Sequence, residues 1–476
     1  MRRWFRLLFV LPSIALGLGF DDAIGQNTTT AASATPPANV AAPVSAGNLT
    51  ISTAKSAIPV ANVTASTPAP NSTAQSNLGI SGNPGAVNTT TGTGWLGREI
   101  GIPADTGVSL GGVWVGDANW IMSGGANPGN VTFNSLLIAD LHVDLEKAIG
   151  LKGASIGSEF LQFNGQPTNA EAGSVQGYNS LPGPPPLNRS ELYQLWWRQE
   201  FFDGKLIVRI GKLVPTIDFN SVVRPVPERG ESESIPAVSG LIYTPLYINP
   251  TMVGVSPGYY NSAYGVTATY VPTKQFYMSY GAYDGSGAQG VQTGLTGPNF
   301  DGHYFQLFEA GYAWELGEQR KPGVIAAGGW SQSGMLSLPS PSHVTQNGAQ
   351  GVYAFGSQRL WFANPGKDNS GVSAFFQYGI NDAKTLPINQ YLGEGITAFG
   401  LIPSRPSDSF GAGAAWSELN RNIYARRDEW MLQAYYQAHL FGTAYFQPAV
   451  TFIPNPGANP NLSPTWTLTM RLLILF

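Results

Sequence analysis

Residues Val131–Glu146 read VTFNSLLIADLHVDLE, and this stretch decides the fold. Its odd positions are apolar almost throughout, whereas its even positions include Thr132, Asn134, Asp140 and His142. Successive side chains of a β-strand point to opposite faces of the sheet, so this alternation predicts a long strand with one apolar and one mostly polar face.

A second region with the same alternation adds a tight turn. The dipeptide Asp203-Gly204 separates residues 192–202 from residues 205–213, and Asp-Gly between two alternating runs predicts a β-hairpin. On the first strand of this hairpin one face collects the apolar side chains, namely Tyr193, Leu195, Trp197 and Phe201. Arg198 and Glu200 share the opposite face, and Arg209 lies on the neighbouring strand.

The same alternation of apolar and polar residues recurs from residue 95 to the C-terminus and predicts sixteen strands. We expect them at 108–120, 131–146, 153–163, 191–202, 205–213, 264–271, 275–283, 304–316, 322–331, 351–363, 371–381, 394–403, 409–417, 428–438, 444–453 and 464–476. Every second connection in this series is short. Short turns at one end and long loops at the other are typical of an all-β, antiparallel transmembrane barrel of the bacterial outer membrane.

The last of these segments carries a further signal. One face is apolar without interruption and consists of Trp466, Leu468, Met470, Leu472, Ile474 and Phe476. An alternating strand with a terminal aromatic residue resembles the signal that the outer-membrane insertion machinery reads. The alternative is a buried final strand of a globular domain.

The lipid environment predicts which face points where. Backbone groups cannot stay unpaired in lipid, so the sheet must close, and charged side chains at the lipid midplane are costly. We therefore expect the charged residues of the strands to face the lumen. Aromatic residues near strand ends suit the membrane interfaces, and here we expect Trp114, Trp330, Trp416, Trp430 and Trp466.

The N-terminus reads as a targeting signal followed by an unstructured segment. Basic residues precede a short apolar run, and Ala23 and Gly25 supply small residues before Gln26, so residues 1–25 are expected to form a secretory signal peptide. An uncleaved anchor is the alternative. Residues 26–94 are rich in Thr, Ala, Ser, Asn and Pro with Lys55 as the single charge, which predicts disorder.

Composition excludes several classes of protein. The chain has no cysteine, so disulfides, zinc-thiolate sites and cysteine nucleophiles are impossible. Its net charge of -4 argues against nucleic-acid binding. No cofactor motif is present, and Asp140 with His142 lacks a third ligand at useful spacing, so we expect no metal.

A sixteen-stranded barrel encloses a lumen too wide for strand side chains alone to fill. The long segment 214–263 is the candidate constriction loop, because it is far more charged than the strands and holds Asp218, Arg224, Glu228 and Arg229. The alternative is a loop that stays outside the barrel.

At this point the chain resembles a known family, the carbohydrate-selective porins of Gram-negative outer membranes (OprB type). The resemblance rests on FDGKLIVRIGK at 202–212, Tyr283-Asp284-Gly285, RPSDSFG at 405–411 and FQPAVTFIPNPG at 446–457, and it covers about residues 95–476. It implies a monomeric barrel in the outer membrane, passive diffusion of small sugars such as glucose, and a constriction lined by arginines, carboxylates and aromatic side chains.

Candidate pore-lining residues follow from strand parity. Arg198, Glu200 and Arg209 are the first choice, because close Arg–Glu pairs bind hydroxyl groups while their charges cancel. The remaining candidates on the lumen face are Glu159, Glu309, Glu429 and Arg471. A structural network of ion pairs that stiffens the wall is the alternative role for all of them.

The expected partners are small sugars, outer-membrane lipids and, through Phe476, the insertion machinery. Two other functions remain open. One is a general or ion-selective porin, and the other is a secreted all-β carbohydrate-binding protein or hydrolase, since paired carboxylates are all that glycoside hydrolysis requires.

Overall fold

The computed structural model describes residues 94–182, 187–222, 239–257, 260–285, 297–300, 302–338 and 343–476. The expected signal peptide and, apart from Gly94, the expected disordered segment 26–94 lie outside the described residues. So do the loop candidates Arg224, Glu228 and Arg229.

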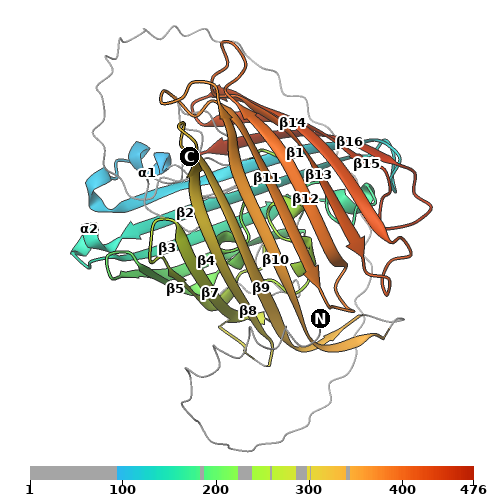
Figure 1. Ribbon diagram of the computed structural model, residues 1–476, viewed down its shortest axis with the longest axis horizontal. Helices are drawn as coiled ribbons and strands as arrows, with labels where there is room; N and C mark the ends of the chain where they lie inside the picture. The colour runs from blue at the N-terminus through green and yellow to red at the C-terminus, as the bar shows by residue number, and fades with distance from the viewer. Residues whose placement is uncertain are drawn as a thin grey trace, which may run out of the picture. The chain divides into compact units, whose positions relative to one another are not determined.

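Sixteen antiparallel strands close into a barrel in which each strand pairs with its neighbours in the chain and β1 pairs with β16 (Figure 1). The strands are β1 Val108–Ser123, β2 Val131–Asp144, β3 Ala154–Asn164, β4 Asn188–Phe201, β5 Leu206–Leu213, β6 Ala263–Tyr270, β7 Phe276–Asp284, β8 Tyr304–Leu316, β9 Lys321–Ser337, β10 Thr345–Phe362, β11 Gly371–Asn381, β12 Ile388–Phe399, β13 Ser409–Leu419, β14 Asp428–Phe441, β15 Ala444–Ile453 and β16 Thr465–Leu475. The predicted sixteen-stranded barrel is confirmed.

Short helices lie in the connections. They are α1 Trp95–Glu99, η2 Ala104–Thr106, α2 Leu145–Ile149, α3 Thr168–Glu171, α4 Pro215–Asp218, η3 Thr244–Leu246 and η4 Pro250–Met252. In the part of the chain that the structure describes, no helix is long and apolar enough to cross a membrane.

Two ends of the barrel differ in character. The connections after odd-numbered strands form the loop end. In it, the name loop L2 stands for the described residues 165–182 and 187, and loop L3 for the described residues 214–222, 239–257 and 260–262. The connections after even-numbered strands form the turn end, where α1 packs against β1 and the backbone of Phe476 exchanges hydrogen bonds of 2.8 Å with Gly112. Both ends of the barrel domain therefore meet at the turn end.

The expected alternation of long and short connections is weaker than the sequence predicts. Strands β9 and β10 extend beyond their predicted bounds and leave only residues 338–344 between them. The added residues are mostly Ser, Gln, Gly and Asn, which resemble a loop in sequence but can continue a paired ribbon because each backbone group still finds its partner.

The face assignment of the last strand is confirmed. Trp466 and Met470 are 44% and 39% exposed on the outer surface, whereas Thr467 and Arg471 on the inner face are buried. Outer-surface side chains are those that contact lipid in a membrane barrel, so this apolar band is the lipid-facing surface.

For three residues, the predicted side of the barrel wall or position at the membrane interface is wrong. Trp330 is buried in the interior rather than at an interface, where it packs against Phe305. Tyr193 is buried because the pairing of β3 with β4 shifts register beside it, and this bulge ends the simple alternation that the prediction assumed. Glu394 is exposed on the outer surface in the middle of β12, although charged strand residues were expected to face the lumen.

Candidate functional site in the barrel lumen

Loop L2 is held against the inner wall by a buried carboxylate. Glu429 of β14 is fully buried and accepts hydrogen bonds from the Ser174 hydroxyl and from the backbone N–H groups of Val175 and Gln176, at 2.8, 2.9 and 3.0 Å. The N–H of Gly457 donates a fourth bond at 2.6 Å. A carboxylate that accepts four bonds fixes the loop backbone beside β14.

A second anchor ties L2 to the strands that close the barrel. Asp117 of β1 forms a two-pronged ion pair with Arg471 of β16, with both N···O distances at 2.8 Å. The side-chain amide of Asn179 donates to Asp117 at 2.8 Å and to Asn119 at 2.7 Å. The closing seam of the barrel and the position of L2 therefore depend on the same polar cluster.

Loop L3 begins at another inner-wall carboxylate. Glu309 of β8 is fully buried and accepts bonds from the hydroxyls of Tyr277 and Tyr353 at 2.8 and 2.9 Å. It also accepts the backbone N–H of Asn220 at 2.7 Å, just after α4, and Asn220 has a positive φ of 52°. Asp218 ends α4 and forms an ion pair with Arg209, so the start of L3 is fixed at two points.

The later part of L3 contacts strands on the other side of the barrel. The N–H groups of Gly240 and Ile242 donate to Tyr435 and Gln433 of β14, at 2.8 and 2.7 Å. Asn381 of β11 donates to the carbonyl of Thr251 at 2.7 Å. Because β5 and β14 are separated by many strands in either direction around the barrel, L3 crosses the lumen.

L2 and L3 also bind each other. The N–H of Thr244 donates to the carbonyl of Gly177 at 2.9 Å, and the N–H of Ser180 donates to the carbonyl of Ile242 at 2.7 Å. The hydroxyl of Tyr260 reaches the carbonyl of Leu181 at 2.7 Å. The two loops therefore form one body inside the barrel.

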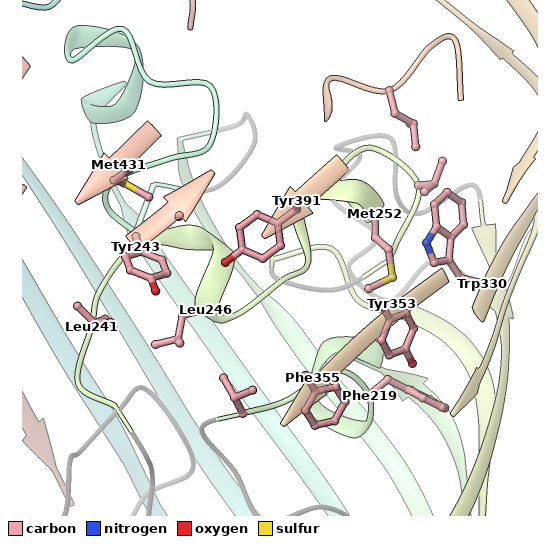
Figure 2. Close-up of a cluster of buried hydrophobic side chains, with 14 of the residues drawn as sticks. Phe219, Leu241, Tyr243, Leu246, Met252, Trp330, Tyr353, Phe355, Tyr391 and Met431 are labelled. Atoms are coloured by element: carbon pink, nitrogen blue, oxygen red, sulfur yellow. The ribbon is translucent and has the colours of Figure 1, made fainter. Parts of the chain in front are cut away.

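Apolar packing fixes this body to the wall, as Figure 2 shows. Loop side chains lie among inward-facing aromatic and sulfur-containing side chains of β9 to β14, and the group comprises Phe219, Leu241, Tyr243, Leu246, Met252, Trp330, Tyr353, Phe355, Tyr391 and Met431. All of them are at most 2% exposed. Burying one such side chain contributes about 1.5–3 kcal/mol, so the loops are held firmly.

Where L3 packs closely against the barrel wall, the strands carry glycines. A Cβ at Gly413 would meet the side chains of Leu241 and Tyr243, and a Cβ at Gly379 would meet Asn249 and Thr251. Close contact between loop and wall at these points depends on the missing side chains.

Two phenols of the loops, those of Tyr178 and Tyr243, have raised pKa values. Burial, aided by Asp117 and Glu171, raises the pKa of Tyr178 well above its ordinary value. Burial, aided by Glu394 on the outer side of the wall, does the same to the pKa of Tyr243. Both phenols therefore remain neutral at physiological pH.

The three residues expected first at a constriction lie together. Arg198 and Arg209 are directly opposite each other on β4 and β5, and Arg198 forms an ion pair with Glu200 at 2.6 Å. Arg209 turns instead to Asp218 and lies 4.7 Å from the ring centre of Trp196. Two guanidinium groups and two carboxylates thus form a charge-balanced group, which we call the Arg–acid cluster.

Glu159 joins the edge of this cluster through a residue that the sequence did not single out. Gln194 donates to Glu159 at 2.7 Å and accepts from Arg209 at 3.4 Å. It has the same parity as Arg198 and Glu200, so alternation places it on the inner face, but as an uncharged side chain it was not among the candidates. Within the cluster, Arg198 and Glu200 keep exposed side-chain surface, at 17% and 36%.

The other three candidates are arranged differently. Glu309, Glu429 and Arg471 are on the inner face, but their exposed fractions are 0%, 0% and 2%. Their polar atoms bind loop backbone, tyrosine hydroxyls or Asp117. Glu309 holds loop L3, whereas Glu429 and the Asp117–Arg471 pair hold loop L2. Loop L2 was not predicted to enter the lumen, since its backbone-mediated contacts leave no side-chain pattern in the sequence.

Comparison with known proteins decides the family. The family model described as carbohydrate-selective porin, OprB family, matches residues 136–476. The chain belongs to this family. It is an outer-membrane porin for carbohydrates, a channel protein of the Gram-negative outer membrane, and the resemblance read from the sequence is confirmed.

Individual relatives of this porin are distant in sequence. It is 22% identical over 396 residues to Porin B of Pseudomonas aeruginosa, a match that covers 72% of this chain and 82% of the relative. The high-pH structure of Pseudomonas putida OprB is similar with a TM-score of 0.67 and 17% identity, covering 81% of this chain and 99% of that one. The low-pH structure of the same protein gives a TM-score of 0.50 at 16% identity, covering 80% and 96%.

Proposed function

We propose that this porin passes small neutral sugars such as glucose by passive diffusion, and that L2 and L3 together form its constriction. The observation that carries the proposal is the joined body of the two loops across the lumen. It is bound to β8, β11 and β14 through buried carboxylates and backbone bonds. A body held at this many points restricts the size of solutes that pass.

The Arg–acid cluster supplies the selectivity in this proposal. Arg198 and Glu200 retain exposed surface, and together with Arg209 and Asp218 their charges cancel. Guanidinium and carboxylate groups both bind hydroxyls, while a balanced cluster does not trap ions. Trp196 beside Arg209 adds an aromatic face of the kind that packs on sugar rings.

In this proposal the porin transports sugars and does not hydrolyse them. Glu309 and Glu429 are fully buried, and their oxygens are occupied by loop and tyrosine donors, which leaves no general acid or base at those positions. The hydrolase alternative is therefore not favoured.

A general porin is the second candidate, favoured by the tight fixation of L2 and L3, since a fixed opening also filters solutes by size alone. Swelling of liposomes containing the purified porin distinguishes the two candidates. Glucose, a disaccharide, a neutral amino acid of similar size and a salt are compared at equal osmolarity. We expect glucose to enter much faster than the amino acid. Rates that follow size alone would demote the protein to a general porin.

We also propose that β16 with Phe476 is read by the insertion machinery before the barrel closes. In the closed barrel β16 is paired with β1 and the Phe476 backbone is bonded to Gly112, so this strand edge is free for recognition only before closure. Replacing Phe476 with Ser should lower the fraction of heat-modifiable, membrane-inserted porin in cells. The same variant should still fold in detergent, and equal insertion in cells would contradict the proposal.

A further inference from the structure

Positive charge at the loop end of the barrel is confined to one place. Among the described residues, every Lys and Arg of the loop-end connections lies in two neighbouring connections, 382–387 and 420–427. Asn420 and Asn422 donate to the carbonyls of Leu386 and Lys384 at 2.7 and 3.2 Å, so the two connections form one patch. We call its cations the basic rim, and they are Lys384, Arg421, Arg426 and Arg427.

Most of this charge has no carboxylate partner. Arg427 pairs with Glu418 at 3.6 Å. Arg421 donates to the carbonyl of Ala425 at 2.6 Å, and Arg426 donates to the carbonyls of Pro460 and Leu462 at 2.8 and 3.3 Å. For Lys384, Arg421 and Arg426, no ion pair is found within the described ranges. Three cations of the rim are therefore without a counter-charge there.

The other carboxylates at this edge of the barrel are bound by neutral donors. Asp382 accepts the backbone N–H and the side-chain amide of Gln350 at 3.0 and 3.2 Å. Asp428 accepts the indole N–H of Trp416 at 3.3 Å and the amide of Asn455 at 3.4 Å. An anion that neutralises the rim must therefore come from outside the chain.

An apolar recess lies on the lipid-facing surface beside this rim. It encloses about 630 Å³ over strands β11 to β16, on the side drawn in orange in Figure 1. Strands β13 and β14, which the 420–427 connection joins, line it with Ala412, Ala414, Leu432 and Ala434. The rim and the recess thus share the same two strands.

Aromatic side chains mark the level at which the rim and the recess meet. Trp430 and Trp466 are 43% and 44% exposed on the outer surface, near the loop ends of β14 and β16. Trp466, which lines the recess, stacks on Phe452 with ring centres 4.5 Å apart. Tryptophans in such positions lie at the membrane interface. The rim is therefore at the level of lipid headgroups, and the recess extends from there into the hydrocarbon layer.

The carboxylate in the recess lies away from the rim. From Trp466 a row of paired residues passes through Phe452, Leu432 and Ala414 to Glu394. Glu394 is at the middle of β12, whereas the rim is beyond the loop ends of the strands. An anion at the rim is thus separated from the charge of this carboxylate.

The chemistry of the two parts defines the ligand. The longer loops of bacterial outer-membrane barrels are extracellular, so the basic rim meets the outer leaflet of the membrane. Arginines bind phosphate through charge-assisted hydrogen bonds, and basic groups beside a membrane attract anionic headgroups. We propose that the porin binds a phosphorylated glycolipid of the outer leaflet, with its phosphate on Arg421 and Arg426 and an acyl chain in the recess. This site is outside the lumen, so it does not rest on how sugars are selected.

Native mass spectrometry of the full-length porin, purified and freed of lipid in detergent, tests the proposal. The probe is a diphosphorylated, acylated glucosamine disaccharide (lipid A). Its dephosphorylated form and phosphatidylethanolamine are the comparisons, since both offer acyl chains without net negative charge. We expect the porin to retain one molecule of the probe and little of the other two. Equal retention of all three lipids would overturn the proposal, and so would a second copy of the porin in place of the lipid.

Removing charge from the rim tests the phosphate contact. Each basic side chain near an anionic lipid surface changes affinity roughly fivefold, so Arg421→Ala/Arg426→Ala should bind the probe roughly twentyfold more weakly. The matched control is Lys205→Ala/Lys367→Ala, which removes two exposed cations at the turn end. It should bind like the unaltered porin. An equal loss in both double variants would show attraction to net charge alone and contradict a site at the rim.

Filling the recess tests the acyl-chain contact without changing charge. Ala414→Trp should lower retention of the probe, whereas Ala327→Trp, outward on β9 and away from the recess, should not. If Ala414→Trp fails to insert, Ala412→Leu narrows the same recess and takes its place. Inorganic phosphate in excess separates the two sources of the anion. Displacement of the probe by phosphate, together with no effect of the recess variants, would reduce the rim to a site for free anions and overturn the proposal.

Discussion

At the scale of single residues, charge balance in the lumen depends on which acid accompanies which arginine. Glu200, the partner of Arg198, is more exposed than Asp218, the half-buried partner of Arg209. Removing Glu200 therefore changes the charge that a solute meets, and removing Arg209 also releases the start of L3.

We expect Glu200→Ala to make the pore more selective for anions and to slow glucose relative to a neutral amino acid. An unpaired Arg198 binds anions in the path of the sugar. Stability should change by less than about 1 kcal/mol, because the pair is partly exposed. Reversal potentials across planar bilayers and liposome swelling measure both effects.

The control is Glu315→Ala, which removes a carboxylate from an exposed pair with Arg320 at the turn end. It should leave selectivity unchanged. If Glu200→Ala and Arg209→Ala both conduct and transport like the unaltered porin, the Arg–acid cluster does not line the path.

A second residue, Asp408, stabilises the 400–408 turn between β12 and β13. Asp408 accepts bonds from Arg405 Nε at 2.7 Å, from the N–H of His439 at 2.9 Å and from the Tyr436 hydroxyl. Burial alone would raise the pKa of Asp408, but these bonds outweigh burial and lower it below the ordinary value. The ionised form therefore stabilises the 400–408 turn above about pH 4, and this contribution is lost as pH falls through the lowered pKa.

Asp408→Asn should cost about 1–3 kcal/mol at neutral pH, the usual worth of bonds to a charged group. It should also flatten the loss of stability on acidification below about pH 4. Urea unfolding monitored by tryptophan fluorescence at several pH values measures this, and an unchanged acid dependence in the variant would contradict it.

At the scale of elements, the position of loops L2 and L3 rests on a few inner-wall groups. L2 depends on Glu429, and L3 depends on Glu309, Gln433 and Tyr435. These anchors lie on different strands, so loosening one loop should leave the barrel wall intact.

Glu429→Gln should release L2 and widen the pore. An amide in place of the carboxylate leaves at least one of the buried N–H groups of Val175, Gln176 and Gly457 without an acceptor, at about 1–3 kcal/mol each. We expect higher single-channel conductance and faster entry of disaccharides with an unchanged heat-modifiable band.

The matched control is Glu418→Gln on the neighbouring strand β13, where the carboxylate pairs with Arg427 near the surface. Its conductance should equal that of the unaltered porin. Equal conductance for Glu429→Gln would show that L2 does not limit the opening.

At the scale of the whole molecule, closure joins the first strand to the last. The pairing of β1 with β16 contains the buried pair Asp117–Arg471, and the same Asp117 holds Asn179 of L2. Barrel stability and loop position are therefore coupled at this seam.

Arg471→Met should destabilise the barrel by about 3–5 kcal/mol, because it leaves Asp117 buried without its cation. The double variant Asp117→Leu/Arg471→Met should recover much of that loss while still weakening the hold on L2. Unfolding temperature on gels and urea titration give the stability. Additive losses in the double-mutant cycle would show that the two charges do not interact.

The sequence by itself determined the strand number, the outer surface and the family. A period of two is a local property, and lipid enforces it on every strand of the barrel, so alternation in segments such as 131–146 and 464–476 suffices to predict sixteen strands. Polar extensions of β9 and β10 escaped prediction because pairing needs only backbone groups.

Only the tertiary structure decided which inward groups are exposed and which are anchors. Glu200 and Glu429 look alike by parity, yet one retains exposed surface while the other is enclosed by L2, whose backbone contacts leave no mark in the sequence. The bulge at Tyr193 and the outward Glu394 were equally hidden. Parity tells which side of a wall a residue faces, and the loops that fold back across the lumen decide what it meets there.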